Sequence, residues 1–167
     1  MKSLFKIITA ICFTLLVSAC SFGFKGISIK PEVKSFAVEN FALIDQAAPN
    51  NLNQIFSEEL RLKVRQESRL TEDNENPDII FSGTVSRYRV EFAAPDANNT
   101  ASLNRLTIEV KIKYENLIDE EDTWEKTYSD FEDYDSNGNL QQLQDGLIDV
   151  IVDDILERAF NDAFTDW

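Results

Sequence analysis

The feature that most constrains the fold of this chain is a strict two-residue alternation over residues 106–114. Every second position there is apolar, and the positions between are polar or charged. Because successive side chains of a strand point to opposite faces of a sheet, this pattern predicts a strand with one face in the core and the other uncovered. The apolar positions are Leu106, Ile108, Val110, Ile112 and Tyr114, and the polar positions are Thr107, Glu109, Lys111 and Lys113.

Two neighbouring stretches predict strands that pair with this one. Residues 79–92 also alternate, but their apolar positions change face near Ser86 and Arg87, which predicts a β-bulge or a strong twist. Residues 124–134 form a third, shorter run, and the acidic segment 119–122 before it has the length of a hairpin loop. The three strands are therefore expected to form a meander.

A further strand and two helices complete the predicted pattern. Pro31 opens a strand-like run over residues 33–41. Residues 52–66 carry apolar side chains three and four positions apart, which predicts an amphipathic helix with its N-cap in residues 49–51. Residues 140–164 predict a longer helix in the same way. Its apolar positions are Leu140, Leu143, Leu147, Ile148, Ile151, Ile155, Leu156, Ala159, Phe160, Ala163 and Phe164.

The order β-α-β-β-β-α predicts an α+β fold. We expect a two-layer sandwich, in which two helices cover one face of a mixed sheet of about four strands. Residues 31–167 then form a single domain, because a chain of this length is typical of one domain with its own core. The other face of the sheet is left to water, lipid or a partner.

The first residues of the chain predict a lipid anchor. Two lysines and an apolar run too short to span a bilayer precede Ser18, Ala19 and Cys20, an order that resembles a bacterial lipobox. We therefore expect residues 1–19 to be a signal peptide that is removed, Cys20 to carry the lipid, and residues 20–30 to form a tether. The alternative is an ordinary secretory peptide with an unrelated cysteine near its cleavage site.

Composition excludes several kinds of function. The chain has no histidine and both cysteines lie in its first 20 residues, so the domain lacks an imidazole base or metal ligand and a thiol pair. The 30 Asp and Glu exceed the 16 Lys and Arg, which leaves a formal charge of −14. Loss of residues 1–19 removes two lysines and no acid, so the mature charge is −16, from 14 basic and 30 acidic residues. We expect a protein that is not an enzyme, needs no cofactor and does not bind nucleic acid.

One segment resembles a calcium-binding loop without completing it. Residues 133–139 carry oxygen-bearing side chains at the first, third and fifth positions and Gly138 at the sixth. The twelfth position is Gln144 where a bidentate glutamate is required, so no metal site is predicted. The simpler interpretation is a turn in which Asn137 or Asn139 caps the last helix and Gly138 adopts a positive φ.

Four acidic residues of the last predicted helix lie four positions apart and therefore share one face. They are Asp145, Asp149, Asp153 and Glu157. We expect this stripe to be the solvated side of the helix, with a surface for a basic partner as the alternative.

Four segments follow the lipobox in an order and spacing that are typical of one protein family. They are FGFKGISI at 22–29, ASLNRLTI at 101–108, FEDYD at 131–135 and AFNDAFTDW at 159–167. Together with Cys20 they resemble the LptE family of lipopolysaccharide-assembly lipoproteins, in its Bacteroidetes form. The resemblance covers nearly the whole mature chain. It implies a sheet with two packed helices, and an outer-membrane lipoprotein on the periplasmic side. Such a protein would sit in the lumen of the β-barrel LptD, support its assembly and help to pass lipopolysaccharide to the cell surface.

Basic and amide residues are the candidate contacts with the barrel or with lipopolysaccharide. In the enterobacterial branch of the family, lipopolysaccharide contact is associated with basic residues, whereas a chain at −16 should on average repel a phosphorylated lipid. The basic residues then form either a local patch or the balanced solvent face of the sheet. The alternative function is a free-standing lipoprotein that binds a small ligand or tethers another envelope protein. The candidate contacts are Arg87, Arg89, Asn98, Asn99, Asn104, Arg105, Lys111 and Lys113.

Overall fold

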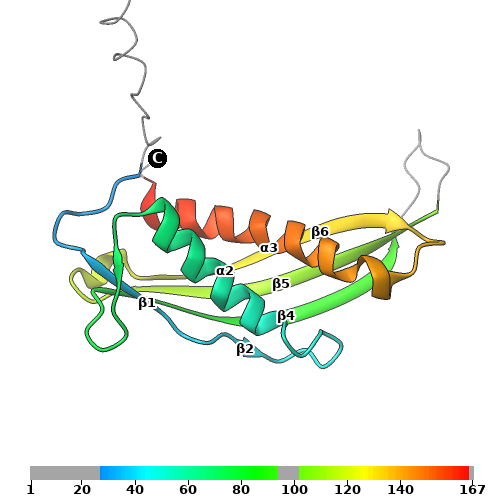
Figure 1. Ribbon diagram of the computed structural model, residues 1–167, viewed down its shortest axis with the longest axis horizontal. Helices are drawn as coiled ribbons and strands as arrows, with labels where there is room; N and C mark the ends of the chain where they lie inside the picture. The colour runs from blue at the N-terminus through cyan, green and yellow to red at the C-terminus, as the bar shows by residue number, and fades with distance from the viewer. Residues whose placement is uncertain (1–26, 94–101, 166–167) are drawn as a thin grey trace, which may run out of the picture.

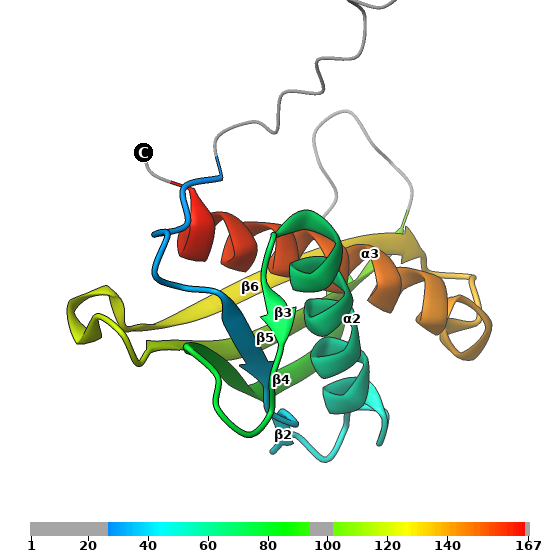
Figure 2. The same ribbon diagram turned by 60° about the vertical axis from the view of Figure 1, so that its left-hand side comes forward.

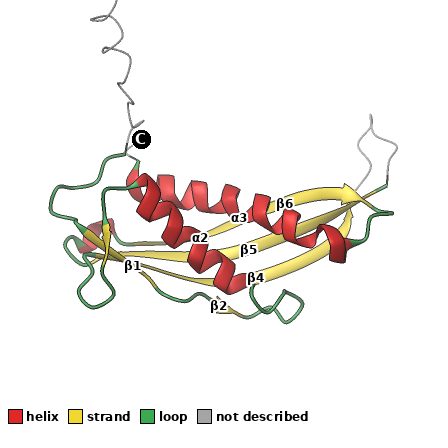
Figure 3. Cartoon of the chain, in the orientation of Figure 1, coloured by secondary structure: helices red, strands yellow, loops and turns green. Residues whose placement is uncertain are grey.

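The computed structural model describes residues 27–93 and 102–165, which form two layers. A long sheet makes one layer, and helices α2 (Leu52–Glu67) and α3 (Leu140–Phe164) make the other (Figure 1; Figure 3). Both helices lie on the same side of the sheet, as the turned view shows (Figure 2). The predicted α+β sandwich with two helices on one face is confirmed.

The sheet has six strands, where about four were expected. They are β1 (Ser35–Val38), β2 (Ala42–Leu43), β3 (Thr71–Glu72), β4 (Ile79–Ala93), β5 (Leu103–Asn116) and β6 (Trp124–Asp135). Their order is β3-β1-β4-β5-β6, and β2 pairs with β4 beyond the end of β1. The pairings of β1 with β3, and of β1 and β2 with β4, are parallel, whereas β4, β5 and β6 form the predicted antiparallel meander.

Of the strand expected over residues 33–41 only residues 35–38 are extended, as β1, and the short strand β2 follows at residues 42–43. The backbone of Phe41 bonds with helix α2 instead of with β4: its N–H donates to Ser57 Oγ at 2.9 Å, and its carbonyl accepts from Asn53 Nδ2 at 2.9 Å. The Phe41 ring turns into the core and lies against Gly83 of β4. These contacts interrupt the strand, so β1 ends at Val38 and β2 begins at Ala42.

The register of β4 against β5 shifts between Val85 and Arg87, which confirms the predicted bulge. Ser86 occupies the irregular position, and its hydroxyl donates to Glu109 Oε1 at 2.9 Å. After the shift Tyr88 pairs with Ile108 and is buried, so the second half of β4 again presents its apolar side chains to the helix layer.

The core lies between the sheet and the two helices. The inward face of α2 is fully buried, as its periodicity predicts, at Leu52, Phe56, Leu60 and Val64. The inward face of α3 is buried from Ile148 to Phe164, but its first turns are more open, and Leu143 is 42% exposed.

The turns before the two helices differ in part from prediction. Asn139 caps α3 as expected, since its side chain accepts a hydrogen bond from Gln141 N at 3.0 Å. Gly138 does not adopt a positive φ, so that prediction is wrong. Glycine is required there by space, because a Cβ would lie 2.9 Å from the carbonyl oxygen of Asp135. Asn51 is the N-cap residue of α2, but its side chain makes no capping hydrogen bond.

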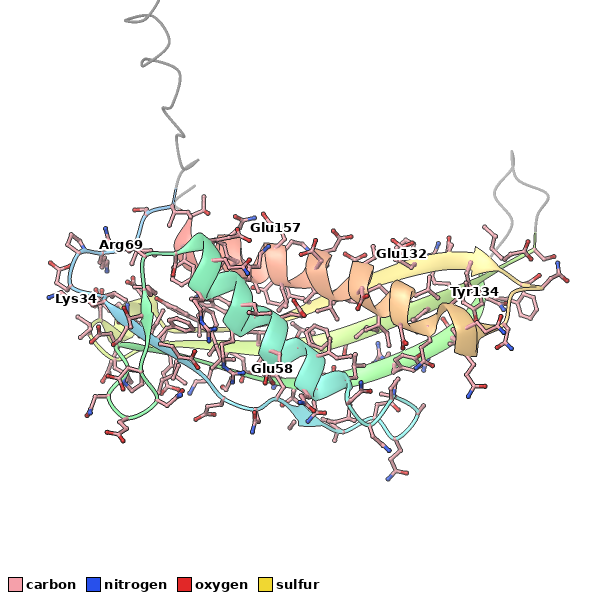
Figure 4. All side chains as sticks on the ribbon, viewed as in Figure 1. Lys34, Glu58, Arg69, Glu132, Tyr134 and Glu157 are labelled. Atoms are coloured by element: carbon pink, nitrogen blue, oxygen red, sulfur yellow. The ribbon has the colours of Figure 1, made fainter. Side chains whose placement is uncertain are left out.

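The N-terminal segment is attached to the domain from Ile27 onward. Ile27 forms a β-bridge with Thr165, and Lys30 Nζ lies 2.7 Å from carboxylate oxygens of both Asp119 and Asp122. Arg69, which follows α2, lies at the same end of the molecule and donates to the carbonyl of residue 29 at 2.7 Å (Figure 4). Within the described part of the chain, neither helix is long and apolar enough to cross a bilayer. The expected signal peptide and Cys20 lie outside the described residues.

Candidate interaction surface on the open face of the sheet

The sheet face turned away from α2 and α3 carries no covering helix within residues 27–93 and 102–165 (Figure 2). We call it the open face. Strand pairing aligns its side chains in rows across β4, β5 and β6, opposite in direction to the core side chains of the same strands. It consists of Ile80, Ser82, Thr84, Arg87, Arg89, Glu91 and Ala93 of β4, Leu103, Arg105, Thr107, Glu109, Lys111, Lys113 and Glu115 of β5, and Glu125, Thr127, Ser129, Phe131, Asp133 and Asp135 of β6.

Every basic side chain of the open face is paired with a carboxylate on the same face. Exposed pairs of this kind contribute only about 0–1 kcal/mol each to stability, so their main effect is on the charge of the surface. Five cations meet five anions in these pairs, and Asp135 at the end of β6 adds one further carboxylate. The pairs are Arg87–Glu109 (3.0 Å), Arg89–Glu91 (3.1 Å), Arg105–Asp133 (2.7 Å), Lys111–Glu125 (3.1 Å) and Lys113–Glu115 (2.6 Å).

Arg105 contacts both a carboxylate and an aromatic ring of this surface. Its Nε and a terminal nitrogen donate to the two carboxylate oxygens of Asp133 at 2.7 and 2.9 Å, a bidentate pair. The hydrogen bonds raise the pKa of Arg105 and lower the pKa of Asp133. The guanidinium also stacks over the ring of Phe131, 3.6 Å from its centroid. Phe131 is 45% exposed, whereas Ile80 and Leu103 of the same face are only partly exposed, so the cluster presents the most accessible large apolar side chain of the open face.

The structure brings five of the predicted contact residues together and separates the others. The five basic ones all lie on the open face, within the balanced ion pairs. Asn104 pairs with Phe92 and Tyr134 and therefore points to the helix side of the sheet, opposite to its neighbour Arg105. Asn98 and Asn99 lie outside the described residues.

The oxygen groups of the calcium-like segment are engaged in other contacts. Asp133 is bound to Arg105, Asp135 Oδ1 accepts from the backbone N–H of Asn137 at 2.8 Å, and Asn139 caps α3. Among the described residues, no group of three or more acidic or cysteine side chains is placed to hold a metal ion. The segment therefore serves as a turn and a helix cap.

A second cluster, of ion pairs on the helix side of the sheet, is not predicted by the sequence. Lys63 of α2 lies between the helices, 2.5 Å from Glu157, 3.1 Å from Glu67 and 3.9 Å from Asp153. Burial alone would lower the pKa of Lys63, but its hydrogen bonds with Glu157 and Glu67 outweigh that effect and raise it. The acidic stripe on α3 was visible in the sequence. Its partner on α2 was not, because nothing in the sequence relates the rotation of one helix to that of the other.

Comparison with known structures finds proteins of the same fold at low sequence identity. The minor lipoprotein from Acinetobacter baumannii has a TM-score of 0.50 at 14% identity, over 77% of this chain and 91% of that one. A PelC dodecamer from Paraburkholderia phytofirmans has a TM-score of 0.51 at 10% identity, over 85% and 94%. A protein from Xanthomonas campestris has a TM-score of 0.51 at 8% identity, over 80% and 87%. At such identities the likeness shows the fold alone.

The family is assigned from the sequence and not from these structures. No curated protein matches the chain. The family model LptE, described as "Lipopolysaccharide-assembly", matches residues 33–166, which is most of the chain and includes every strand and helix described above. The match confirms the resemblance to this family, and the lipobox and the segment 22–29 lie ahead of the matched residues. This protein therefore belongs to the LptE family of lipopolysaccharide-assembly proteins.

Proposed function

We propose that this protein is a non-enzymatic lipoprotein subunit of the lipopolysaccharide translocon. A lipid on Cys20 holds it at the periplasmic side of the outer membrane, and the domain sits in the lumen of an LptD-type β-barrel, which it plugs and helps to assemble. The family match supports the pathway. The observation that carries the partner is the open face, a long surface of three strands with no cover among the described residues.

The chemistry of the open face suits the inner wall of a barrel. Lumen-facing positions of membrane barrels are polar, whereas their outward positions are apolar. The open face is polar at most positions, and each of its basic side chains is paired with a carboxylate, so it can approach a polar wall without bringing an unpaired cation out of water. Arg105 and Phe131 supply the anchor, since arginine and aromatic side chains dominate the binding energy of protein interfaces.

The same balance favours the barrel over lipopolysaccharide as the occupant of this face. A phosphorylated lipid is bound by side chains with free donors and excess positive charge. On the open face each guanidinium and ammonium group already faces a carboxylate. We therefore assign the basic residues of β4 and β5 to the organisation of a contact surface, and not to a lipid phosphate site.

Depletion combined with affinity purification tests the proposal. Loss of the protein should lower the amount of correctly assembled barrel and of surface lipopolysaccharide together. Purification from solubilised outer membrane should recover the barrel in a stoichiometric amount. If no barrel protein is recovered and export is normal without this protein, the free-standing lipoprotein that binds a small ligand or tethers another protein takes the place of our proposal.

A pair of matched variants localises the contact. Phe131→Ser removes the aromatic surface of the open face, and Val150→Ser changes a residue of α3 that is exposed to a similar extent, 46% against 45%. We expect the first variant to recover severalfold less barrel than wild type and the second to recover a normal amount. Equal recovery with both variants would remove Phe131 from the interface.

A further inference from the structure

Helices α2 and α3 enclose a groove on the side of the molecule opposite to the open face. It has a volume of about 370 Å³ and is lined by α2 between Ile55 and Glu67 and by α3 between Asp149 and Leu156. The lining positions of α2 recur three and four residues apart, so they form one face of that helix. Both helices contribute the same two kinds of side chain, apolar ones at the floor and acidic ones at the rim.

The rim of the groove carries an excess of negative charge. Glu59 and Glu67 of α2 and Asp149 and Asp153 of α3 are its acidic residues. Lys63 is the one basic side chain among the described residues that line it, and this lysine is 89% buried and bound to Glu67 and Glu157. Asp153 is 79% exposed and lies 3.9 Å from Lys63, so most of its charge faces solvent. A second cation would therefore be attracted to the rim.

The position of Glu67 adds to this excess. It is the last residue of α2, where the negative end of the helix dipole disfavours an acid. Its pairing with Lys63 also runs in the weaker direction, because the lysine precedes the glutamate by four residues. Helix stability thus does not account for an acidic residue at this place.

The apolar part of the groove is reached through Leu62. Val152 and Leu156 close the floor at 1% exposure, while Leu62 of α2 is 39% exposed and faces the groove. An exposed leucine beside a concave acidic rim suits a peptide segment that has one apolar and one basic side.

We propose that this groove docks a basic amphipathic segment of a partner polypeptide. Its apolar side chains contact Leu62, and its lysine or arginine side chains meet Glu59, Asp149 and Asp153. A second copy of this chain is a poor occupant, because each mature copy carries a charge of −16. An anionic lipid surface is repelled in the same way. This surface is separate from the open face, so binding in the groove does not depend on whether the open face contacts the barrel.

Binding to defined peptides tests the proposal. The full chain from residue 20 onward, with Cys20→Ala to keep it free of lipid, is titrated with a 15-residue peptide that carries leucines at helical spacing flanked by lysines. A peptide with glutamates for the lysines and one with alanines for the leucines are the ligand controls. We expect the first peptide to bind more weakly as salt rises, and neither control to bind comparably.

Two double variants on the same helix separate the groove from the general acidity of the protein. Asp149→Asn with Asp153→Asn removes two charges from the rim, and Asp145→Asn with Asp154→Asn removes two exposed charges of α3 that do not line the groove. We expect the rim variant to weaken binding about fivefold and the control variant to leave it unchanged. Leu62→Gln should also weaken it, and Leu117→Gln, an exposed residue that does not line the groove, should not.

Three results would overturn the proposal. Equal loss of binding in the two double variants would mean that bulk charge alone attracts the peptide. Equal binding of the alanine-containing peptide would mean that Leu62 takes no part. Concentration-dependent dimers in sedimentation, abolished by Leu62→Gln, would make a second copy of this chain the occupant.

Discussion

At the scale of the residue, single side chains decide where strands break and how closely layers approach. Phe41 leaves the sheet edge because its backbone bonds with Ser57 and Asn53 of α2, and its ring then needs a neighbour without a side chain. Gly83 provides that space: a Cβ there would lie 2.4 to 2.7 Å from three carbon atoms of the Phe41 ring. The identity of residue 83 is thus set by packing, and not by a turn.

Gly83→Ala should destabilise the domain by about 1–3 kcal/mol, because the ring or the strand must shift to admit the methyl group. Gly146→Ala is the matched control. Gly146 lies inside α3 with no atom within 4 Å of its would-be Cβ, so this change should stabilise the domain by up to about 1 kcal/mol. Urea unfolding of both variants measures the difference. Two shifts of the same sign would show that Phe41 does not fill this space.

Cys20 carries a second prediction at this scale. Cys20→Ala should abolish incorporation of labelled fatty acid and release the protein from the membrane fraction, because the short apolar run 7–17 leaves the lipid as the durable anchor. Metabolic labelling and fractionation measure both effects. Undiminished labelling of the variant would contradict the assignment.

At the scale of the element, α3 is joined to β6 by a polar contact at its C-terminal end. Tyr128 Oη donates to Asp162 Oδ2 at 2.7 Å, and Lys126 Nζ lies 2.9 Å from the same oxygen. Burial by itself would raise the pKa of Asp162, but these two hydrogen bonds outweigh it and lower the pKa below the usual 3.8. The folded state therefore favours the ionised form of the Asp162 carboxylate.

This contact predicts a loss of stability in acid. A carboxyl with a lowered pKa contributes stability that is complete above its unfolded pKa, near 3.8, and is lost as pH falls through the folded value. Asp162→Asn should therefore reduce the drop in the urea midpoint between pH 6 and pH 3, relative to wild type. Asp154→Asn, an exposed acid of the same helix, should not change that drop. A full wild-type drop in Asp162→Asn would exclude this contact as a source of the pH dependence.

The elements also show how far the sequence predicts this fold. The meander, its bulge and both helices follow from periodicity, because each extends over enough residues for a repeat of two or 3.6 to be visible. β2 and β3 have two residues each, too few to show any alternation, and they exist because neighbouring segments hold them against β4 and β1. The basic residues of β4 and β5 were identified, but their exact pairing with acids depends on strand register, which the sequence leaves undetermined.

At the scale of the whole molecule, one sheet separates two surfaces of different character. On the open face each basic side chain is paired with a carboxylate, and Arg105 and Phe131 form its anchor. The opposite side carries the acidic groove between α2 and α3. The N-terminal segment joins the domain at one end, where Ile27 pairs with Thr165 and the segment lies beside the C-terminal turn of α3 (Figure 1). A lipid anchor at Cys20 would then hold the molecule by that end and leave both surfaces free to bind.

Site-specific photo-crosslinking in cells tests directly whether the open face is the surface that contacts the barrel. A photoreactive residue at Ser129 probes the open face, one at Asp154 probes the exposed side of α3, and one at Asn98 probes the connection between β4 and β5. We expect the probe at Ser129 to capture the LptD-type barrel efficiently and the probe at Asp154 to capture far less of it. Capture at Asn98 would place that connection in the interface as well. Capture of the barrel from Asp154 and none from Ser129 would contradict the proposed interface, because the barrel would then bind the helix layer instead of the open face.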